Sequence, residues 1–440
     1  MSTEENVITR NAPKIGFAPG SFEIQSLVMT NSGGATRDIR KLLESFSITE
    51  EIYSPVVTFT GVFRDDKNFF NNFSITGQEI LDVKLSKVPS TKAKGSTANQ
   101  VSLKFYVKEY PNYTRTLDFP SVQTYTVIAI SDFAYISSLK KISKSIKGNV
   151  AKNIQDVFST DLYREVIVRG RCTSEFDGII TIQPPLKALD WLRRRAFDGD
   201  GSPFFLYSTI SEPTGKITLA SWKEISNGGV QFNYVYKQRL ESDPDTQEAY
   251  DEELSRILDM RSTIGLDKLA MSNRGSYSNK TYITDYAMKT YTDKEFTLKK
   301  KSFASLEYSI NGTGGKGVSL YETYDASQSF IQINTASADN ALPNSTTGPV
   351  QDNINSAKSF FALMNESSHN ITVYGDFRLN PGSKIKLKIP RAIRREANET
   401  EPEEDELLSG EYIIVVAAHR FAGGVYTSQL KLVKNNLPKN

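Results

Sequence analysis

Apolar and polar residues alternate along much of the chain, and this alternation predicts strands with one buried face. Isoleucine and leucine alternate with lysine over 384–389, and a similar alternation runs over 81–85 and 426–433. Turn sequences separate these runs, with Leu-Asn-Pro-Gly at 379–382 and Gly-Gly at 423–424. Proline presets φ and glycine tolerates positive φ, so both sequences favour tight turns. The pattern therefore predicts antiparallel strands joined by short connections.

The predicted strands gather in two regions of the chain. From residue 21 to about 132, short alternating runs recur with turn residues between them, as in a small β-barrel or sandwich. The region 367–436 has the same plan, with an early strand, a glycine turn, an alternating strand and two longer closing strands. Residues 204–225 predict a hairpin that we assign to this second region. The predicted fold class is mainly β with α+β insertions.

Apolar residues at helical spacing mark the segments between these regions. The strongest helix signal is 184–197, which begins with Pro-Pro and places leucines on one side. A second helix is expected within 243–258, a third in 354–364, and a lysine-rich segment with helical spacing covers 137–157. The polar stretch 262–350 carries only scattered strand-like pieces. Helical and mixed insertions therefore interrupt the β structure.

Charge is nearly balanced, and this argues against a general nucleic-acid binder. The chain has 53 basic and 51 acidic residues, for a formal charge of +2. Phosphate contacts normally require a strong basic excess. A local basic surface, such as the lining of a pore, remains open.

One cysteine, Cys172, excludes an internal disulfide framework and a cysteine-based zinc cluster. We interpret it as a small buried hydrophobic residue in a reducing cytoplasm. The N-terminal sequence lacks the basic flank and apolar run of a signal peptide, and no apolar stretch approaches the ~18 residues of a membrane span. We expect a chain that is made in, and stays soluble in, a cytoplasm.

The candidate residues for chemistry give no recognisable site. His369 and His419 are the only histidines, no G-x-S-x-G motif accompanies them, and their spacing does not suit a metal. His419 lies in a predicted strand, so a structural role is expected. The glycine-rich run 312–317 has glycine where a phosphate loop needs Ser or Thr after lysine. We predict no catalytic, cofactor-binding or metal-binding residues, and no cofactor.

Each charged cluster has a structural and a functional interpretation. Arg193–Arg195 could clamp a ligand, but a solvated helix end or subunit salt bridges are the favoured interpretation. The carboxylates Asp65-Asp66 and 403–405 give no geometric signal of acid–base catalysis. The acidic run 398–406 follows basic residues at 391–395 and sits where a hairpin would turn. Such runs are usually solvated, and docking on a basic partner is the alternative.

The last strands carry a resemblance to a known family. Residues 375–385 match the pattern Gly-x-Phe-x-Leu-x-Pro-Gly-x-x-Ile, and Tyr412, His419 and Phe421 match the strand that follows it in that family. The chain thus resembles the baseplate central hub proteins of contractile-tailed phages of the T4 type, and the related modules of type VI secretion VgrG proteins. The specific motif covers only about the last sixty residues. The acidic insertion and the segment 262–350 depart from the family pattern.

The resemblance implies two tail-tube-like antiparallel β-barrels per chain and a homotrimer. Six barrels in a ring would adapt a hexameric tail tube to a trimeric central spike and enclose the DNA channel without sequence recognition. The implied partners are the tail tube protein or a tube-initiator ring, the spike, the baseplate wedge proteins and, as a further candidate, the tape measure protein. The implied location is the virion baseplate, after assembly in the bacterial host cytoplasm.

The resemblance also divides the chain into segments. These are an N-terminal arm (1–20), a first tube-like barrel (21–132), an α+β middle domain (133–203), the first part of a second barrel (204–240), a helical and loop-rich insertion (241–366) and the second part of that barrel (367–436), which contains an acidic loop (391–408).

A non-enzymatic structural role is the leading hypothesis, and two alternatives from other classes stay open. A tail-tip peptidoglycan hydrolase lacks a recognisable catalytic constellation, although 262–350 is too featureless to clear it. A carbohydrate-binding tail module would use the tyrosine-rich β surfaces. Clearing of cell walls would favour the first alternative, and glycan binding would favour the second.

Overall fold

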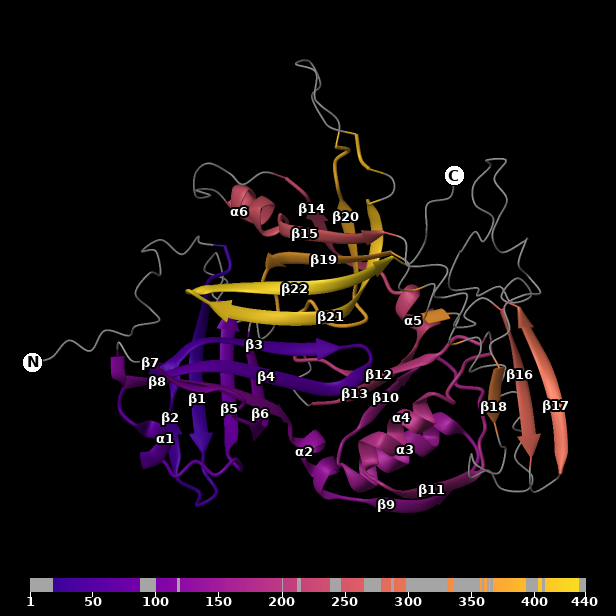
Figure 1. Cartoon of the computed structure of the whole chain (residues 1–440). Helices are drawn as coiled ribbons and strands as arrows, with labels where there is room; N and C mark the ends of the chain where they lie inside the picture. Colours follow the sequence, from indigo (N-terminus) through magenta and orange to yellow (C-terminus); the bar gives the residue numbers. More distant parts are fainter. Residues whose placement is uncertain are drawn as a thin grey trace, which may run out of the picture.

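A computed structural model shows one large sheet that runs through most of the chain, with smaller sheets and most of the helices beside it (Figure 1). The prediction of a mainly β fold with helical insertions is confirmed. The structure describes residues 19–87, 100–116, 119–199, 201–211, 215–237, 247–264, 278–285, 289–297, 331–334, 357, 360–361, 364, 367–392, 403–405 and 408–434.

The strands at one end of the large sheet form a first ring. Each strand is hydrogen-bonded to the next, and the ring closes through a bridge between Ser21 and Val425, beside a 2.8 Å hydrogen bond from Tyr426 N–H to Gly20 O. Its interior is a solid hydrophobic core that includes Phe59 and Phe105. In ring order the strands are β1 (Phe22–Thr30), β5 (Ile80–Lys87), β6 (Gln100–Glu109), β8 (Phe119–Ser131), β4 (Ser54–Asp65), β3 (Leu43–Glu51), β21 (Gly410–Ala422) and β22 (Val425–Lys434).

Two short strands and two short helices accompany this ring. The strand β2 pairs with β1, and β7 pairs with β8. Their bounds, with those of the short helices, are β2 (Thr36–Asp38), β7 (Tyr113–Thr116), η1 (Arg40–Leu42) and α1 (Phe69–Asn72).

A second ring uses the same hairpin β21–β22. It closes through a bridge between Val235 and Arg256, next to a 2.9 Å hydrogen bond from Val235 N–H to Ser255 O. Leu387, Tyr412 and Leu430 belong to its core, which is also filled. In ring order its strands are β14 (Val230–Val235), β20 (Lys384–Lys388), β21, β22, β19 (Ser367–Tyr374) and β15 (Ile257–Ile264). The expected antiparallel barrel is wrong at one place, because β14 runs parallel to β20.

The strand β21 changes partner in its middle, and this joins the two rings. Its first part pairs with β20, and residues 416–422 pair with β3. The register of β21 against β22 shifts between Ile414 and Val416. At this point Gly382 N–H donates to Ile414 O (2.8 Å) and Ile52 N–H donates to Val415 O (2.9 Å). A bulge of this kind bends a strand and re-aims its side chains, so one hairpin serves both rings.

A mixed α/β unit packs beside the rings. It contains a three-stranded sheet in the order β10–β13–β12 and an antiparallel pair β9–β11, with helices packed against them. Its elements are α2 (Asp132–Leu139), β9 (Ile142–Ile146), α3 (Val150–Asp161), β10 (Val166–Arg169), β11 (Gly178–Gln183), α4 (Pro185–Arg193), β12 (Phe204–Ser208), β13 (Ile217–Ser221) and α5 (Trp222–Ser226).

The hairpin 204–225 differs from its predicted place in the second barrel. Strands β12 and β13 pair with each other and β13 pairs with β10, whereas only β14 of the segment 204–240 joins the second ring. Every residue of β12 and β13 is buried. Phe204 and Leu206 face the helices, and Phe205 packs with Trp222 against the outside of β21. A strand buried on both faces belongs to an inner layer, which explains the difference.

The helices expected in 184–197, 137–157 and 243–258 are confirmed in part. The helix expected in 184–197 is α4, while the lysine-rich segment 137–157 contains the strand β9 between α2 and α3. Residues four apart share a face in both a strand and a helix, so the spacing of Ile142 and Ile146 did not discriminate. The helix α6 (Gln247–Leu254) ends before Ile257, which begins β15.

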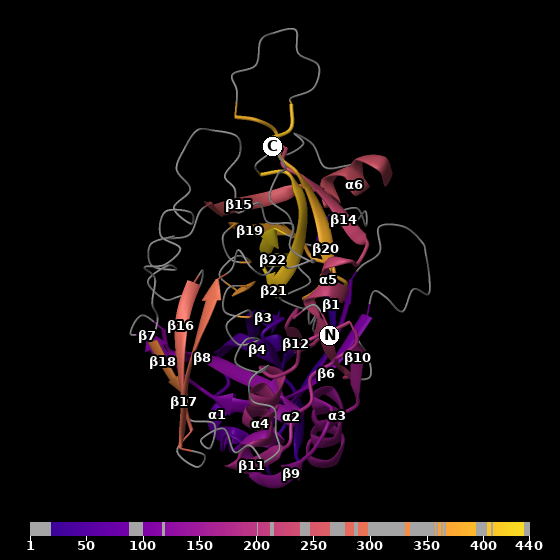
Figure 2. The same ribbon diagram turned by 90° about the vertical axis from the view of Figure 1, so that its right-hand side faces the viewer.

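The remaining elements lie at the edge of the molecule. The strands β16 (Ser278–Asp285), β17 (Thr290–Thr297) and β18 (Ile331–Asn334) form a separate sheet in the order β17–β16–β18 (Figures 1 and 2). The helical residues Phe360 and Met364 are buried with Trp222. The glycine-rich run 312–317, Asp243, Asp245 and most of the acidic loop lie outside the described residues.

Candidate functional site

The sequence motif at 375–385 forms the turn before β20 and the start of that strand. Gly375 has no room for a side chain, because a Cβ there would lie 2.2 Å from the ring of Tyr426. Phe377 packs on the same ring with a centroid distance of 5.0 Å. Gly382 has φ of +82° and would place a Cβ 2.8 Å from the hydroxyl of Tyr207. The motif residues therefore fit this turn against the shared hairpin and the α/β unit at once.

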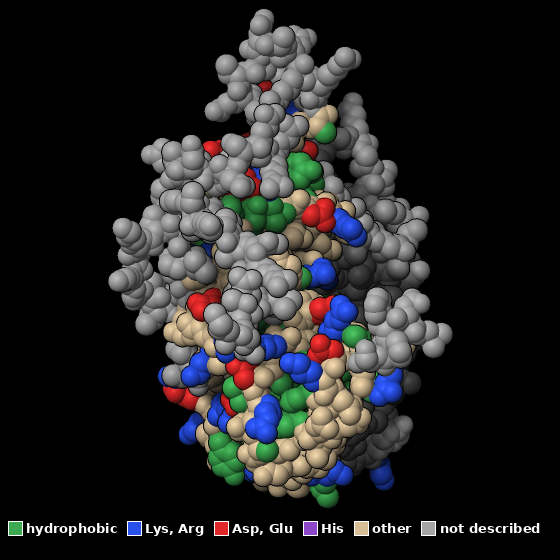
Figure 3. Space-filling model, turned by 90° about the vertical axis from the view of Figure 1, so that its left-hand side faces the viewer, with side chains coloured by type: hydrophobic (Ala, Val, Ile, Leu, Met, Phe, Trp, Pro, Cys, Tyr) green, Lys and Arg blue, Asp and Glu red, His purple; other side chains and the backbone are tan. Residues whose placement is uncertain are grey.

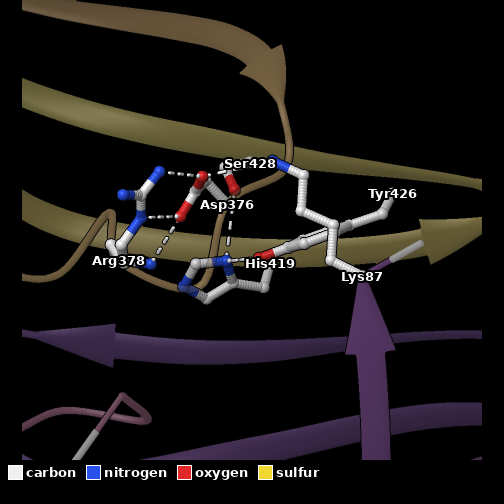
Figure 4. Close-up of polar contacts among 6 residues, drawn as sticks. All are labelled: Lys87, Asp376, Arg378, His419, Tyr426 and Ser428. Carbon is white, nitrogen blue, oxygen red and sulfur yellow. Dashed lines mark hydrogen bonds and ion pairs between the residues drawn. The ribbon is translucent and has the colours of Figure 1, made fainter. Parts of the chain in front are cut away.

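An ion triad beside this turn links the two rings. Asp376 accepts hydrogen bonds from Nε and Nη2 of Arg378 at 2.9 Å each, and Lys87 of β5 approaches it at 3.1 Å (Figure 4). Burial favours the neutral acid most strongly, but the Arg378 hydrogen bonds and the Lys87 charge outweigh it and lower the pKa of Asp376 to about 2. Because Lys87 belongs to the first ring, the triad is a polar tie between the rings.

His419 lies in the middle of the shared hairpin and is completely buried. Its Nδ1 is 2.7 Å from the Tyr426 hydroxyl and 3.1 Å from Ser428 Oγ (Figure 4). Its Nε2 is 3.6 Å from Oε1 of Glu50 on β3. Both Glu50 and His419 are 0% exposed. The prediction that His419 is a strand residue is confirmed, and its partners join β21 to β22 and β3.

Glu50 and Asn380 bring the α/β unit into the same cluster. Glu50 Oε2 accepts the backbone N–H of Ile210 at 2.8 Å. With its amide oriented to satisfy its neighbours, Asn380 donates to Glu50 Oε1 (3.1 Å) and accepts from Ser211 Oγ (2.6 Å). Burial raises the pKa of Glu50, against the opposing contacts of His419 and Ile210.

Glu50, Asp376, Asn380, His419 and Tyr426 form what we call the junction cluster. It lies where the first ring, the second ring and the α/β unit meet.

His369 occupies a separate cluster in the second ring. Its Nδ1 is 2.7 Å from Ser262 Oγ, its Nε2 is 2.9 Å from the Tyr412 hydroxyl, and that hydroxyl donates to Leu408 O at 2.7 Å. Burial, aided by the charge of Lys434, lowers the pKa of His369 to about 4. The ring is therefore neutral at physiological pH and ties β19 to β15 and β21. The two histidines serve as structural groups in different places.

A Ser–His–Glu arrangement is present but closed to substrate. Ser428, His419 and Glu50 follow one another at 3.1 and 3.6 Å, an order that resembles a hydrolase triad. All three side chains are 0% exposed, so no substrate atom reaches the serine without opening the joint between the rings. Among the residues that the structure describes, no group of three or more His, Cys, Asp or Glu is placed to hold a metal ion.

The other candidate residues have ordinary structural partners. Arg193 and Arg194 both pair with Asp190 of the same helix, at 2.8 and 2.7 Å, and Arg195 lies 4.1 Å from the ring centroid of Trp191. These contacts fit the favoured interpretation of a helix end. Cys172 is half-buried.

The remaining acidic candidates also lie in structural surroundings. Asp65 is buried and accepts the Lys67 N–H, and Glu403 pairs with Arg391 at 2.7 Å. No described helix is both long and apolar enough to cross a membrane.

Glu50 was not identified from the sequence as a member of the site. It continues the buried face of Phe46 and Ile48 in β3, but its charge argued against burial. Its partners come from the distant strand β21 and from the α/β unit. The pairing itself carried no local signature. The motif glycines and His419 were visible in the sequence because each sits in a fixed pattern of turn and strand residues.

Comparisons with known proteins identify solved structures of similar fold. No family model matches the sequence, and no similar curated protein was found. Among solved structures, a 43 kDa tail protein of prophage MuSo2 from Shewanella oneidensis is 11% identical, with a TM-score of 0.51 over 94% of this chain and 100% of its own. A tail protein from Neisseria meningitidis MC58 is 11% identical, with a TM-score of 0.50 over 94% of this chain and 96% of its own. The chain is therefore similar in fold, over nearly its whole length, to these two tail proteins.

Proposed function

We propose that this protein is a non-enzymatic structural subunit of a phage tail baseplate, and specifically the central hub of a contractile tail. The observation that carries the proposal is the pair of strand rings built on one shared hairpin. The fold similarity to two tail proteins over nearly the whole chain supports it. The burial of the Ser428–His419–Glu50 arrangement supports a role without catalysis.

In this proposal three chains form one closed assembly. Two rings per chain give six rings, which can contact a six-fold tail tube on one side and a three-fold central spike on the other. Such an assembly uses heterologous contacts that close after three copies. The cores of both rings are filled with side chains, so the channel for DNA would lie between subunits.

The proposed partners follow from this position in the tail. They are the tail tube protein or a tube-initiator ring, the central spike, the baseplate wedge proteins and the tape measure protein, with assembly in the host cytoplasm and a final place in the virion. Acidic and basic side chains are intermixed over the described part of the face in Figure 3. Mixed charge suits a conduit through which DNA slides without sequence recognition.

The division into domains is part of the same proposal. We assign 21–132 with β21 and β22 to the first tube-like unit. The second unit comprises β14 and β15 with 367–436, and the hairpin 204–225 belongs to the middle unit. The segment 1–20 remains proposed as an N-terminal arm.

Native mass measurement of the purified chain tests the proposed assembly. We expect a species of three times the 49.2 kDa of one chain, alone or after addition of the spike protein. A strictly monomeric chain at high concentration, with no trimer after spike addition, would contradict the hub assignment. A trimer that fails to bind spike or tube protein would contradict the adaptor role alone.

A carbohydrate-binding tail module is the second candidate, and one surface favours it. On the outlying sheet, the rings of Tyr282 and Tyr291 stack at 5.8 Å, and Tyr291 is 63% exposed. Lys280 lies 5.8 Å from the Tyr282 ring centroid and pairs with Asp293 at 2.8 Å. An exposed aromatic face beside polar groups is suited to a sugar ring.

Glycan-array binding tests this second function. Binding that is lost in Tyr291→Ala and kept in Tyr163→Ala, an equally exposed tyrosine elsewhere at 69%, would establish it. No binding by the wild-type protein would remove it.

A further inference from the structure

Glu50 is a buried acid with one basic side chain near it. Within the described part of the chain, His419 is the basic group within 4.0 Å of its carboxylate. The two cations of the neighbouring triad, Lys87 and Arg378, both contact Asp376 instead. An ionised carboxylate removed from water and without a close cation is costly. The charge state of Glu50 therefore depends on His419.

One proton sets the charge of Glu50. The Nδ1 of His419 faces two hydroxyls, those of Tyr426 and Ser428, which can either donate to it or accept from it. The Nε2 lies 3.6 Å from Glu50 Oε1, beyond hydrogen-bond distance, and is a buried polar atom without a hydrogen-bond partner. Loss of the Glu50 proton leaves a negative charge in a fully buried site.

Within the described part of the chain, the neighbouring elements bring hydrogen-bond donors to Glu50, while the cations Lys87 and Arg378 contact Asp376. The turn before β20 contributes Asp376, Arg378 and Asn380, β5 contributes Lys87, and β22 contributes Tyr426. The α/β unit contributes the Ile210 N–H and Ser211. Burial raises the pKa of Tyr426, and the negative charge of Asp376 and the nearby Tyr234 of β14 raise it further.

The pair lies at the strand pairing that joins the two rings, so its charge affects that pairing. Glu50 lies on β3 and His419 on β21, and the register of this pairing sets Ala417 opposite Glu50 and His419 opposite Ile48. This is the strand pair through which the first ring meets the part of β21 that it shares with the second ring.

We propose that Glu50 and His419 form a proton-operated latch that holds β3 against β21 and fixes the two rings to each other. With Glu50 protonated the latch is closed. When the proton leaves, the buried carboxylate loosens the β3–β21 pair. The latch does not depend on the proposed function, because it would operate in any protein built on this joint.

The sign of the pH effect follows from burial. Burial raises the pKa of Glu50 above its ordinary value, so the folded chain holds the proton more tightly than the unfolded chain. The resulting stability is present at low pH and is lost as the pH rises through the raised pKa. Because one proton is involved, the open fraction of the joint grows about tenfold per pH unit between the ordinary pKa of a glutamic acid and the raised pKa, and it is constant above the raised pKa.

Hydrogen exchange of the full-length chain as a function of pH tests the latch. The amides of 45–51 and 416–422 report the β3–β21 pair, with rates corrected for the chemical dependence of exchange on pH. We expect wild type and Glu44→Gln, a control at an exposed position of the same strand, to show the tenfold increase in opening per pH unit. Glu50→Gln keeps the acceptor for Ile210 and removes the charge, so its opening should not change with pH.

The same pH profile in wild type and Glu50→Gln would overturn the latch. If Glu50→Gln does not fold, His419→Gln decides the question. The pH at which the pair opens should then rise, because the contact of His419 that opposes the raised pKa of Glu50 is lost. An unshifted opening pH would overturn the proposal.

Discussion

At the scale of single residues, a few close contacts fix the joint between the rings. Gly375 is the sharpest of them, because the Tyr426 ring occupies the place of its Cβ at 2.2 Å. The ring of Tyr426 is in turn stacked on Phe421 of the same hairpin, with centroids 4.3 Å apart. A methyl group at 375 has to displace this stack, and a close-packed interior resists such a shift.

Gly375→Ala is therefore expected to lower the free energy of unfolding by at least about 1–3 kcal/mol, the usual cost of overpacking. Chemical denaturation measures it. Gly229→Ala is the matched control, because nothing lies within 4 Å of a Cβ there. Equal stability of the two variants would show that Tyr426 does not pack on Gly375.

The buried His369 predicts an acid-sensitive stability. Its pKa is lowered to about 4 from 6.5, so the unfolded chain binds a proton more readily between these values. Stability is fully present above pH 6.5 and is lost as the pH falls to about 4, by about 3 kcal/mol for this group. His369→Gln should remove this loss in pH-dependent denaturation. A wild-type profile that is flat between pH 6.5 and 4, relative to the variant, would refute it.

Much of the residue-scale picture was accessible from the sequence, and the rest was not for a physical reason. Alternation identified the strand faces, and the turn glycines carried their own signature. The burial of Glu50 arises from a pairing between residues 45–51 and 416–422. The alternation of β3 puts Glu50 on the same face as Phe46 and Ile48. No local pattern encodes a contact over such a distance, so the partners of Glu50 were not predictable.

At the scale of elements, the hairpin β21–β22 organises the molecule. Its bulge at 414–416 lets one strand leave β20 and join β3. The sequence predicted two similar β regions but not that they share strands, because alternation defines the faces of a strand and says nothing about its edges. The assignment of 204–225 was wrong in the same way, since fully apolar strands fit either a barrel or an inner layer.

The loop between β20 and β21 is expected to be dispensable only in part. Arg391 pairs with Glu403 at 2.7 Å, and Pro390 forms a bridge with Glu404. A short Gly-Ser link in place of 394–401 should therefore change the free energy of unfolding by less than about 0.5 kcal/mol.

A second variant shows where the structural part of this loop begins. Asp405 accepts the Leu408 N–H at 3.0 Å, and its main chain bonds to Ile389 and Ser409. Asp405→Ala should cost about 1 kcal/mol, the usual worth of a local cap. Thermal unfolding compares the two variants. A large loss of stability on replacing 394–401 would show that the acidic segment is structural.

At the scale of the whole molecule, two filled rings and a packed α/β unit form one solid body. Polar ties cross every boundary between them, from Lys87 to Asp376, from Ser211 to Asn380, and from Ile210 to Glu50. A subunit with fixed ring orientation is what a closed assembly requires, because small errors in angle would prevent closure after three copies.

Single-particle electron microscopy of the purified assembly tests the central claim most directly. We expect three copies of the chain around an open channel, with six strand rings arranged at nearly equal angles at one end and three-fold symmetry at the other. Assemblies with another number of copies, or rings that do not surround a common channel, would contradict the proposed hub.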